Sequence, residues 1–343
     1  MHAITDRQSL ISALDCRERQ FTEELIAEGG RIKRENVGTK TYLRGLIEIS
    51  NKCRKDCLYC GIRCSNVQVE RYEMSEEEII SCALKAMALN YGSICIQSGE
   101  RCDKAFTDRI SSVIRKIKAL TDGRTGITLS LGEQSRETLM EWFEAGAHRY
   151  LLRIEASNPM LYRRLHPENS LHSYDTRLKT LYDLKEIGYQ VGSGVMIGLP
   201  YQTPADLADD LLFLKNFDID MVGMGPYIPH PQTPLAALQY PADGRRLELS
   251  LKMVALLRML MPKINIAATT ALEVLDKKGR EKALAAGANI VMPNISPASS
   301  KSRYSLYDKK TSLSEDINLE DAEIGFGEWG DSLHFLAKRA DIE

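Results

Sequence analysis

The sequence predicts an α/β fold, a closed (β/α)8 barrel of the TIM type, and three observations support this prediction. Short β-rich runs alternate with longer amphipathic stretches from Tyr42 onward. The alternation occurs eight times over about 250 residues, which is the usual length of such a barrel. Helix start and stop signals separate the units. Because strand order cannot be read from spacing, an open doubly wound sheet is the structural alternative.

The strands of this barrel are expected in eight short, mostly apolar runs. In chain order they are Leu43 to Ile49, Ser93 to Gln97, Ile127 to Leu131, Arg149 to Ile154, Gln190 to Ile197, Met221 to Met224, Ile264 to Ala268 and Ile290 to Met292. Runs of this length and composition are typical of buried strands.

Longer amphipathic stretches between the strands are expected to be helices. They are Ser75 to Asn90, Thr107 to Leu120, Ser135 to Ala145, Tyr174 to Ile187, Thr203 to Asn216, Arg246 to Met261 and Lys278 to Ala286. Their ends carry residues that begin and end helices. Ser75 precedes three glutamates, Thr203 precedes Pro204, and glycines follow several helical runs, at Gly92, Gly146, Gly188 and Gly287.

Polar residues gather where the predicted strands end. They are Ser50 with Asn51, Gln97 to Glu100, Thr128 with Ser130 to Glu133, Arg153 with Glu155, Ser193 with Met196, Gly223 to Tyr227, Thr269 with Thr270, and Met292 with Asn294. In a parallel barrel, the carboxyl ends of all strands face one site. We therefore expect the functional site at this end of the barrel.

The chain is expected to divide into three regions. Residues 1–41 form an N-terminal helical segment that packs over the barrel bottom, residues 42–307 form the barrel, and residues 308–343 form a tail. The tail is acidic and weakly patterned from Leu313 to Glu323, so loose docking is expected.

Composition limits the partners of the chain. No apolar run is long enough for a signal peptide or a membrane span, so a cytoplasmic protein that binds no membrane is expected. The formal net charge is −2, from 45 Lys and Arg against 47 Asp and Glu, which gives no reason to expect nucleic acid. A small-molecule partner is expected instead. The scattered histidines form no evident Ser-His-Asp set, so no hydrolytic role is assigned.

Cysteine usage indicates a metal site. All eight cysteines lie between Cys16 and Cys102, and in a reducing compartment they indicate metal ligands or buried thiols before disulfides. Cys53, Cys57 and Cys60 directly follow the first predicted strand. Three thiolates can hold a 4Fe-4S cubane and leave one iron open to chelate a substrate methionine. The alternative is a structural zinc site with Cys64 as the fourth ligand.

The loop Cys53-Arg-Lys-Asp-Cys57-Leu-Tyr-Cys60 resembles the signature of the radical S-adenosylmethionine (SAM) superfamily. Further segments resemble the HydE family of FeFe-hydrogenase maturation proteins, in the biotin synthase-like branch of that superfamily. These segments cover almost every strand end. They are residues 44–51, 58–61, 97–100, 128–133, 150–153, 196–200, 225–231, 268–271 and 287–294.

This resemblance implies a 4Fe-4S cluster and SAM as cofactors, and an enzyme that reductively cleaves SAM to methionine and a 5′-deoxyadenosyl radical. Cys53, Cys57 and Cys60 match the catalytic cluster ligands. Gly99 would let the backbone approach the methionine, and Glu100 would hold its ammonium. The family's SAM-binding positions as a whole match Tyr59, Gln97, Ser98, Gly99, Glu100, Glu155, Arg177 and Met196.

The resemblance also implies a substrate chamber deeper in the barrel, and a role in assembling the hydrogenase H-cluster from a cysteine-bound iron carbonyl cyanide unit. Arg153 can fork onto a carboxylate, or it can pair with Glu155 or Glu133. The paired threonines in the chamber can equally be ordinary strand-end caps. The positions that match the chamber are Thr128, Arg153, Met224, Thr269, Thr270, Met292, Tyr304 and Tyr307.

Three features depart from the family. Many members carry further cysteines near the C-terminus for an accessory cluster, whereas this chain has none after Cys102, so only one cluster is expected. Cys64 is an additional thiol that is expected to be idle, and the tail beyond Asp308 does not match the family.

The partners that the resemblance implies are an electron donor, such as a ferredoxin or flavodoxin, and other hydrogenase maturation proteins. Two alternatives remain open from the sequence. One is a biotin synthase-like or methylornithine-forming enzyme that acts on an organic small molecule. The other is a non-catalytic Fe-S scaffold that passes on iron without consuming SAM.

Overall fold

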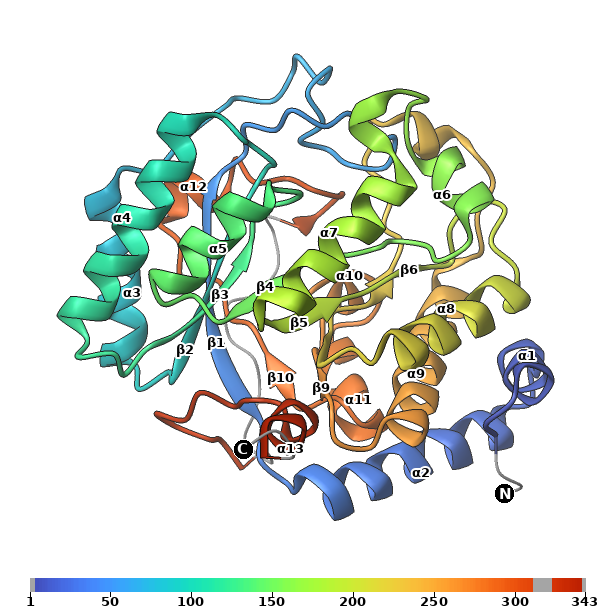
Figure 1. Cartoon of the computed structure of the whole chain (residues 1–343). Coiled ribbons are helices and arrows are strands. Elements are labelled where there is room, and N and C mark those ends of the chain that lie inside the picture. Colours follow the sequence, from blue (N-terminus) through green and yellow to red (C-terminus); the bar gives the residue numbers. More distant parts are fainter. Residues whose placement is uncertain (1–3, 311–322, 341–343) are drawn as a thin grey trace.

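A barrel of eight parallel strands forms the centre of the protein in the computed structural model, which describes residues 4–310 and 323–340 (Figure 1). The strand order in the sheet is β10-β1-β2-β3-β4-β5-β7-β9. A parallel bridge between Ala267 and Ile290 joins the two outer strands and closes the ring. The predicted barrel is therefore confirmed over the open sheet. The strands are β1 (Tyr42–Ser50), β2 (Ser93–Ser98), β3 (Gly126–Ser130), β4 (Arg149–Leu151), β5 (Gln190–Ser193), β7 (Met221–Val222), β9 (Asn265–Ile266) and β10 (Ile290–Val291).

Several strands are shorter than predicted. β4 ends at Leu151, three residues before the predicted Ile154, and the run Gln190 to Ile197 divides into β5 and β6 (Met196–Ile197). β6 pairs with β8 (Gly225–Pro226) as a separate two-stranded extension beyond the carboxyl ends of β5 and β7. This extension carries the backbone of the barrel further towards its mouth.

The predicted helices surround the barrel, as Figure 1 shows. The Ser75 and Thr203 side chains cap α3 and α8 in reciprocal capping boxes, and Gly188 ends α7 in a left-handed conformation. These three boundaries are where the sequence signals placed them. The helices are α3 (Glu76–Ala88), α4 (Lys104–Leu120), α5 (Arg136–Glu144), α7 (Tyr174–Ile187), α8 (Pro204–Phe217), α9 (Asp243–Leu260) and α11 (Gly279–Ala286).

Short helical turns between these elements escaped prediction because they contain too few residues to show a helical period. They are α6 (Pro159–Leu165), η1 (Ser170–His172), η2 (Pro234–Ala237), α10 (Ala271–Leu275) and α12 (Ala298–Lys301). All of them lie in connections after strands, at the end of the barrel where the polar residues gather.

The N-terminal segment forms two helices, α1 (Arg7–Asp15) and α2 (Arg19–Val37). It was expected over the barrel bottom, and α2 lies at that end of the molecule, where it packs on the outer helices α9 and α11, while α1 packs on α8. Gly29 makes this close packing possible, because a Cβ atom there would lie 2.3 Å from the Ala286 carbonyl oxygen. The lower edge of the molecule in Figure 1 shows α2 beneath these helices.

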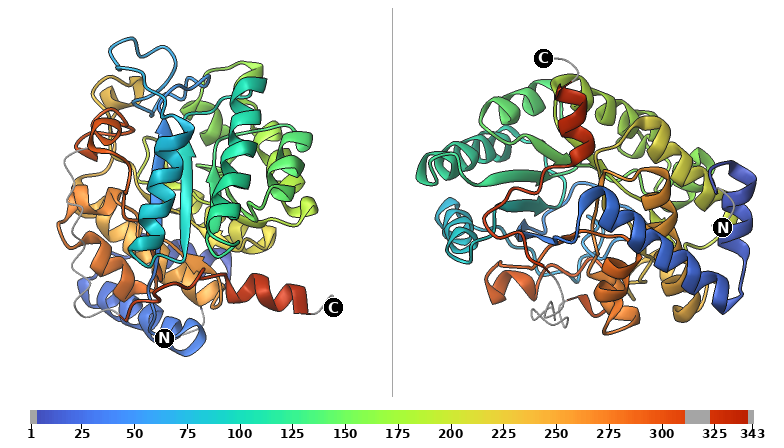
Figure 2. Two further views of the ribbon diagram at one scale, coloured as in Figure 1. Left: turned by 90° about the vertical axis from the view of Figure 1, so that its left-hand side faces the viewer. Right: turned by 90° about the horizontal axis from the view of Figure 1, so that it is seen from below.

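C-terminal residues also lie across the barrel bottom. Residue 324 bridges to Thr41, and the segment continues across the strand starts to α13 (Leu333–Ala340) (Figure 2). Arg44 donates to the Gly330 carbonyl at 3.0 Å and Arg149 donates to the Trp329 carbonyl at 2.9 Å. The acidic stretch predicted from Leu313 lies outside the described residues, apart from Glu323. Among the described residues, no helix combines the length and apolar character of a membrane span.

Candidate functional site

A cavity of about 1670 Å³, counting its open mouth, lies at the carboxyl ends of the strands. It is the place where the predicted polar strand ends meet. Of the residues predicted for the site, those that line it are Cys53, Cys57, Tyr59, Cys60, Gln97, Ser98, Gly99, Glu100, Arg153, Glu155, Arg177, Met196, Thr269, Thr270, Met292, Tyr304 and Tyr307.

The loop after β1 holds the three cysteines at one side of this cavity. The Arg54 amide donates to the Glu100 carbonyl at 2.9 Å, and the Glu100 amide donates to Cys53 Sγ at 3.3 Å. Gly99 is required for this contact, since a Cβ atom there would lie 2.4 Å from the Lys52 carbonyl oxygen. The end of β2 therefore holds the beginning of the cysteine loop through backbone contacts.

The three thiols suit a cluster in chemistry and placement. Burial raises the pKa of the Cys57 thiol to about 12. Burial also raises the pKa values of Cys53 and Cys60, and for Cys60 the neighbouring Cys57 and Cys53 thiolates add to this effect. Bound iron would offset the free-energy cost of holding charged thiolates in this buried site, because a cation favours the thiolate form. Within the described residues, no three Cys, His, Asp or Glu side chains are close enough to share one metal ion, whereas a cubane binds each thiolate to a different iron. Cys64 is exposed and does not line the cavity.

A buried network of charges supports the cysteine loop from inside the barrel. Lys55, from the loop itself, donates to Glu133 at 2.8 Å, and Arg177 donates to the same carboxylate at 2.5 Å. Burial opposes the charged form of Glu133, but the Arg177 and Lys55 cations hold the pKa of its carboxyl below the usual value. Glu100 accepts from the Glu133 amide at 2.8 Å, and burial raises its pKa. Sequence reasoning missed Lys55 as a site residue, because an isolated charge normally indicates a solvated side chain. Glu133 was expected among the polar strand ends, but as a partner of Arg153 and not of Lys55.

Glu155 lies across the cavity in a strained backbone conformation, with a φ of 66°. Its amide donates to the Gly194 carbonyl and its carbonyl accepts from the Met196 amide, so β6 holds it in place. Arg153 pairs with the Glu155 carboxylate at 3.0 Å, which is one of the two arrangements left open by the sequence. Arg177 donates to the Arg153 carbonyl at 2.6 Å and thereby joins this pair to Glu133.

Residues 303–310 form a strap that closes the opposite wall of the cavity. The Gly61 amide donates to the Leu306 carbonyl at 2.8 Å, and Asn51 Nδ2 donates to the Arg303 carbonyl at 2.8 Å. The Tyr307 and Thr270 hydroxyls lie 2.7 Å apart. The strap therefore links the cysteine loop to the last strands of the barrel.

Lys310 and Glu48 are two further cavity residues that sequence reasoning missed. The Lys310 ammonium contacts the fully buried Glu48 carboxylate, which also accepts from Asn294 at 2.8 Å. The ammonium also lies 5.0 Å from the centre of the Tyr304 ring. No sequence signal marked Lys310, because it lies in the region predicted to be a loosely docked tail.

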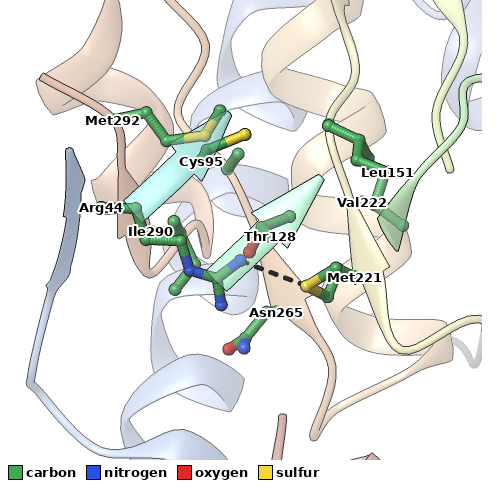
Figure 3. A pocket seen from close by; sticks show the side chains of 11 residues that line it. Arg44, Cys95, Thr128, Leu151, Met221, Val222, Asn265, Ile290 and Met292 are labelled. Carbon is green, nitrogen blue, oxygen red and sulfur yellow. Dashed lines mark hydrogen bonds between the residues drawn. The ribbon is translucent and has the colours of Figure 1, made fainter. Parts of the chain in front are cut away.

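Two predicted chamber residues do not line the main cavity. Thr128 lines a smaller cavity of about 350 Å³ below it, together with Arg44, Met221 and Asn265, and Figure 3 shows these side chains around the Arg44 guanidinium. Met292 lines both cavities, so the smaller one lies directly under the larger. Met224 is buried in the core, and its carbonyl accepts from the Thr269 hydroxyl at 3.3 Å.

Comparison with known proteins agrees with this geometry. The model of the radical SAM superfamily matches residues 47–214. The chain is 47% identical to the [FeFe] hydrogenase maturase subunit HydE of Thermotoga maritima, covering 90% of this chain and 86% of that one. It is 28% identical to the 3-methylornithine synthase of Methanosarcina acetivorans, covering 85% of this chain and 80% of that one, and 30% identical to the biotin synthase of Geobacillus kaustophilus, covering 80% and 79%.

Solved structures show the same fold. The crystal structure of methylornithine synthase (PylB) superposes with a TM-score of 0.75 at 22% identity, covering 98% of this chain and 92% of that one. That of the maturase HydG superposes with a TM-score of 0.75 at 22% identity, covering 90% and 69%. The barrel, the cysteine loop at its mouth and the extent of the sequence match lead to one conclusion. The chain belongs to the radical SAM superfamily, within the HydE family, and is an enzyme that cleaves SAM with a 4Fe-4S cluster.

Proposed function

We propose that this enzyme takes part in the assembly of the FeFe-hydrogenase H-cluster, with a cysteine-bound iron carbonyl cyanide unit as its substrate. The observation that carries the proposal is the 47% identity to a hydrogenase maturase over 90% of the chain. The identities to the methylornithine and biotin synthases are much lower, at 28% and 30%. The match spans the substrate side of the barrel as well as the cysteine loop.

In this proposal, Cys53, Cys57 and Cys60 hold the cluster. SAM lies between the end of β2 and Glu155, where Gly99 lines the cavity and Glu100 offers a carboxylate. Arg177 faces this space with a buried guanidinium that can attract the methionine carboxylate. The remaining residues proposed to contact SAM are Tyr59, Gln97, Ser98 and Met196, all of which line the cavity.

The substrate would lie deeper, between the SAM site and the strap of residues 303–310. Hydroxyl groups from Thr269, Thr270 and Tyr307 and the Arg153 guanidinium line this part and suit an anionic or cyanide-bearing group. Met292 and Tyr304 complete the chamber. Thr128 would act from the lower cavity, and Met224 through the carbonyl group that holds Thr269.

The chain's own residues prepare the reaction by binding, orienting and shielding. When bound, the cluster and SAM supply an electron and a 5′-deoxyadenosyl radical. The strap and the β6–β8 extension surround the space between SAM and substrate, which limits quenching of the radical by solvent. The network of Lys55, Glu133 and Arg177 holds the cysteine loop and the SAM-facing cation in one rigid unit.

The proposal includes a cytoplasmic location, an electron donor such as a ferredoxin or flavodoxin, and contacts with other hydrogenase maturation proteins. The relative of 47% identity is itself a maturase subunit, which supports a role among several maturation proteins. An acidic electron carrier would need to approach the cluster from the barrel mouth, because the cysteine loop lies there.

The experiment has two arms. Anaerobically reconstituted protein should bind about four irons per chain and, once reduced, yield methionine and 5′-deoxyadenosine. The gene should also restore hydrogenase activity to an FeFe-hydrogenase producer that lacks its own maturase of this family. Turnover of SAM without restored hydrogenase would refute the assembly role and direct the search to an organic substrate.

The cluster ligands are tested by paired substitutions. Cys57→Ala should abolish the cluster, because only two ligands remain, whereas Cys64→Ala should bind iron like the wild type, because its thiol is exposed outside the cavity. Iron content and the spectrum of the reduced cluster are the measurements. Loss of iron in Cys64→Ala would show that the ligand set is misassigned.

A further inference from the structure

The α6–η1 segment, residues 158–172, covers the outer side of the cysteine loop, residues 53–60. Figure 1 shows α6 at the barrel mouth, near the loop that follows β1. Four residues of the loop contact the segment: Lys55 donates to the Leu171 carbonyl, Asp56 to His172, Leu58 to the Leu165 carbonyl, and Tyr59 approaches His166. Nothing in the sequence pattern indicated this support, because α6 and η1 are too short to show a helical period.

His172 accepts a hydrogen bond from the backbone between two of the cysteines. The Asp56 amide donates to His172 Nε2 at 2.9 Å. Nε2 must therefore be unprotonated, which places the ring proton on Nδ1, and Nδ1 donates to Asn169 Oδ1 at 2.7 Å. Burial, followed by the nearby Lys55 cation, lowers the pKa of His172 to about 4, so the ring stays neutral and Nε2 stays an acceptor.

His166 has the same tautomer and contacts the aromatic residue of the loop. Its Nδ1 donates to the Tyr162 carbonyl at 2.8 Å, and its Nε2 lies 3.5 Å from the Tyr59 hydroxyl. The ring stacks on Tyr162 with centroids 4.1 Å apart and meets the Tyr59 ring edge-on at 5.5 Å. Burial lowers the pKa of His166 to about 3. Tyr59 is thus fixed between His166 on one side and the cavity on the other.

We propose that His166 and His172 are positioning residues for the cofactors: His172 sets the backbone between Cys53 and Cys57, and His166 sets the Tyr59 ring against SAM. The inference rests on the proposed assignment of these cysteines and of Tyr59. If the histidines only filled space, the volume of the ring would be enough. Instead, the lone pair on Nε2 of each histidine faces a donor of the cysteine loop, the Asp56 amide for His172 and the Tyr59 hydroxyl for His166. Mutation of a residue that holds a metal ligand in place, without touching the metal, commonly lowers the affinity of the site for the metal about 10- to 100-fold.

The two histidines should affect different properties of the holoenzyme. Without the His172 acceptor, the Asp56 amide is released beside the cluster, and hydrogen bonds near cluster sulfurs help to set the reduction potential. His172→Phe should therefore shift the midpoint potential and speed iron loss to a chelator about tenfold. His166→Phe should leave iron retention unchanged, because it does not touch the backbone of the loop. In His166→Phe, the Tyr59 ring is no longer held against SAM, so the spectral change that SAM causes in the reduced cluster should require about tenfold more SAM.

The decisive comparison separates the acceptor atom from the ring. A glutamine amide oxygen can reach the position of Nε2, so His172→Gln and His166→Gln should restore most of the wild-type behaviour. His148→Phe is the matched control, because His148 is exposed at the start of β4, at the other end of the barrel. If His172→Phe fails to fold, Asn169→Ala and Asn169→Asp test the same tautomer, and only the alanine variant should lose iron faster.

Four measurements on anaerobically reconstituted holoenzyme decide the question: iron release, midpoint potential, the SAM titration and 5′-deoxyadenosine formation. The proposal is supported if both phenylalanine variants change as described and both glutamine variants recover. Phenylalanine variants that match His148→Phe, or glutamine variants that fare no better than phenylalanine, would overturn it. Cys57→Ala in parallel separates the two hypotheses, since a cluster retained in that variant would refute the ligand assignment and leave the histidine contacts in place.

Discussion

Asp210 is a buried carboxyl group with no salt-bridge partner among the described residues. It lies in α8, where Oδ1 accepts from the Ser157 amide at 2.7 Å and from its hydroxyl at 2.6 Å. Oδ2 is buried and has no hydrogen-bond partner among those residues. Burial raises the pKa of Asp210 to about 7. The Ser157 contacts hold the chain two residues after Glu155, so the carboxyl group also supports the cavity wall.

This raised pKa predicts a stability that depends on pH. A group whose pKa is higher in the folded state binds its proton more tightly there, so its contribution to stability falls as pH rises from about 4 to about 7. The side chain of Asp210→Asn cannot ionise. The free energy of unfolding of this variant should therefore rise relative to that of the wild type across this pH range, by up to about 4 kcal/mol for a pKa shift of about three units. Unfolding free energies of both proteins at several pH values are the measurement. Parallel curves would contradict the prediction.

Single residues differed greatly in how far the sequence revealed them. The position of the cysteine motif, Gly99 and Glu100 at the cavity was predictable, because these residues directly follow the first two predicted strands of a parallel barrel. Lys55 lies between two of those cysteines and was still missed. A lone lysine normally indicates a solvated side chain, and its burial depends on Glu133, which lies 78 residues away in the chain. Long-range charge pairs of this kind leave no local pattern.

Helix α2 shows the same limit for an element. The segment was predicted to be helical, but the two helices on which it packs were not predicted, because an apolar helix face can pack on several partners. Gly29 settles the contact: a Cβ atom would lie 2.8 Å from Ala255 Cα in α9 as well as 2.3 Å from the Ala286 carbonyl in α11. By contrast, α7 was predicted at its observed bounds, and Gly188 was the signal for its end. The Ser173 side chain, which accepts from the Thr176 amide, caps its start.

Two glycine substitutions in helices should have opposite effects. Gly29→Ala forces α2 away from α9 and α11 and should cost about 1–3 kcal/mol of stability. Gly244→Ala, in the first turn of α9, meets no atom within 4 Å and should gain roughly 0.5–1 kcal/mol, because alanine loses less conformational freedom on folding. Denaturant unfolding of both variants gives the comparison. A neutral Gly29→Ala would show that α2 can move without cost.

At the scale of the whole molecule, the two ends of the barrel were predictable to different degrees. The mouth carries side chains whose chemistry is visible in sequence. The bottom is closed by carbonyl groups of Trp329 and Gly330, which accept from Arg149, Arg44 and Asn265. A backbone carbonyl has no signature in the amino-acid sequence, so the docking of this segment could not be foreseen.

Truncations test the importance of the closed bottom. A chain ending after residue 323 leaves the buried Arg44 and Arg149 without these carbonyl acceptors. Its free energy of unfolding should fall by about 3 kcal/mol or more. A chain ending after Lys338 keeps these acceptors and also keeps the pairs of Lys338 with Asp218 and with the buried Asp220, so its free energy of unfolding should fall by about 1 kcal/mol or less. Equal losses in the two truncations would contradict the role assigned to the carbonyl contacts. Unfolding midpoints and iron content are the readouts.

The strap has a consequence for biosynthesis. The ribosome makes the three thiols long before it makes Arg303 and Leu306, which belong to the wall that encloses them. A nascent chain would thus display unshielded cysteines to oxygen and stray metal until the strap has been made. The enclosed site can form only when the first and last βα units of the barrel have met.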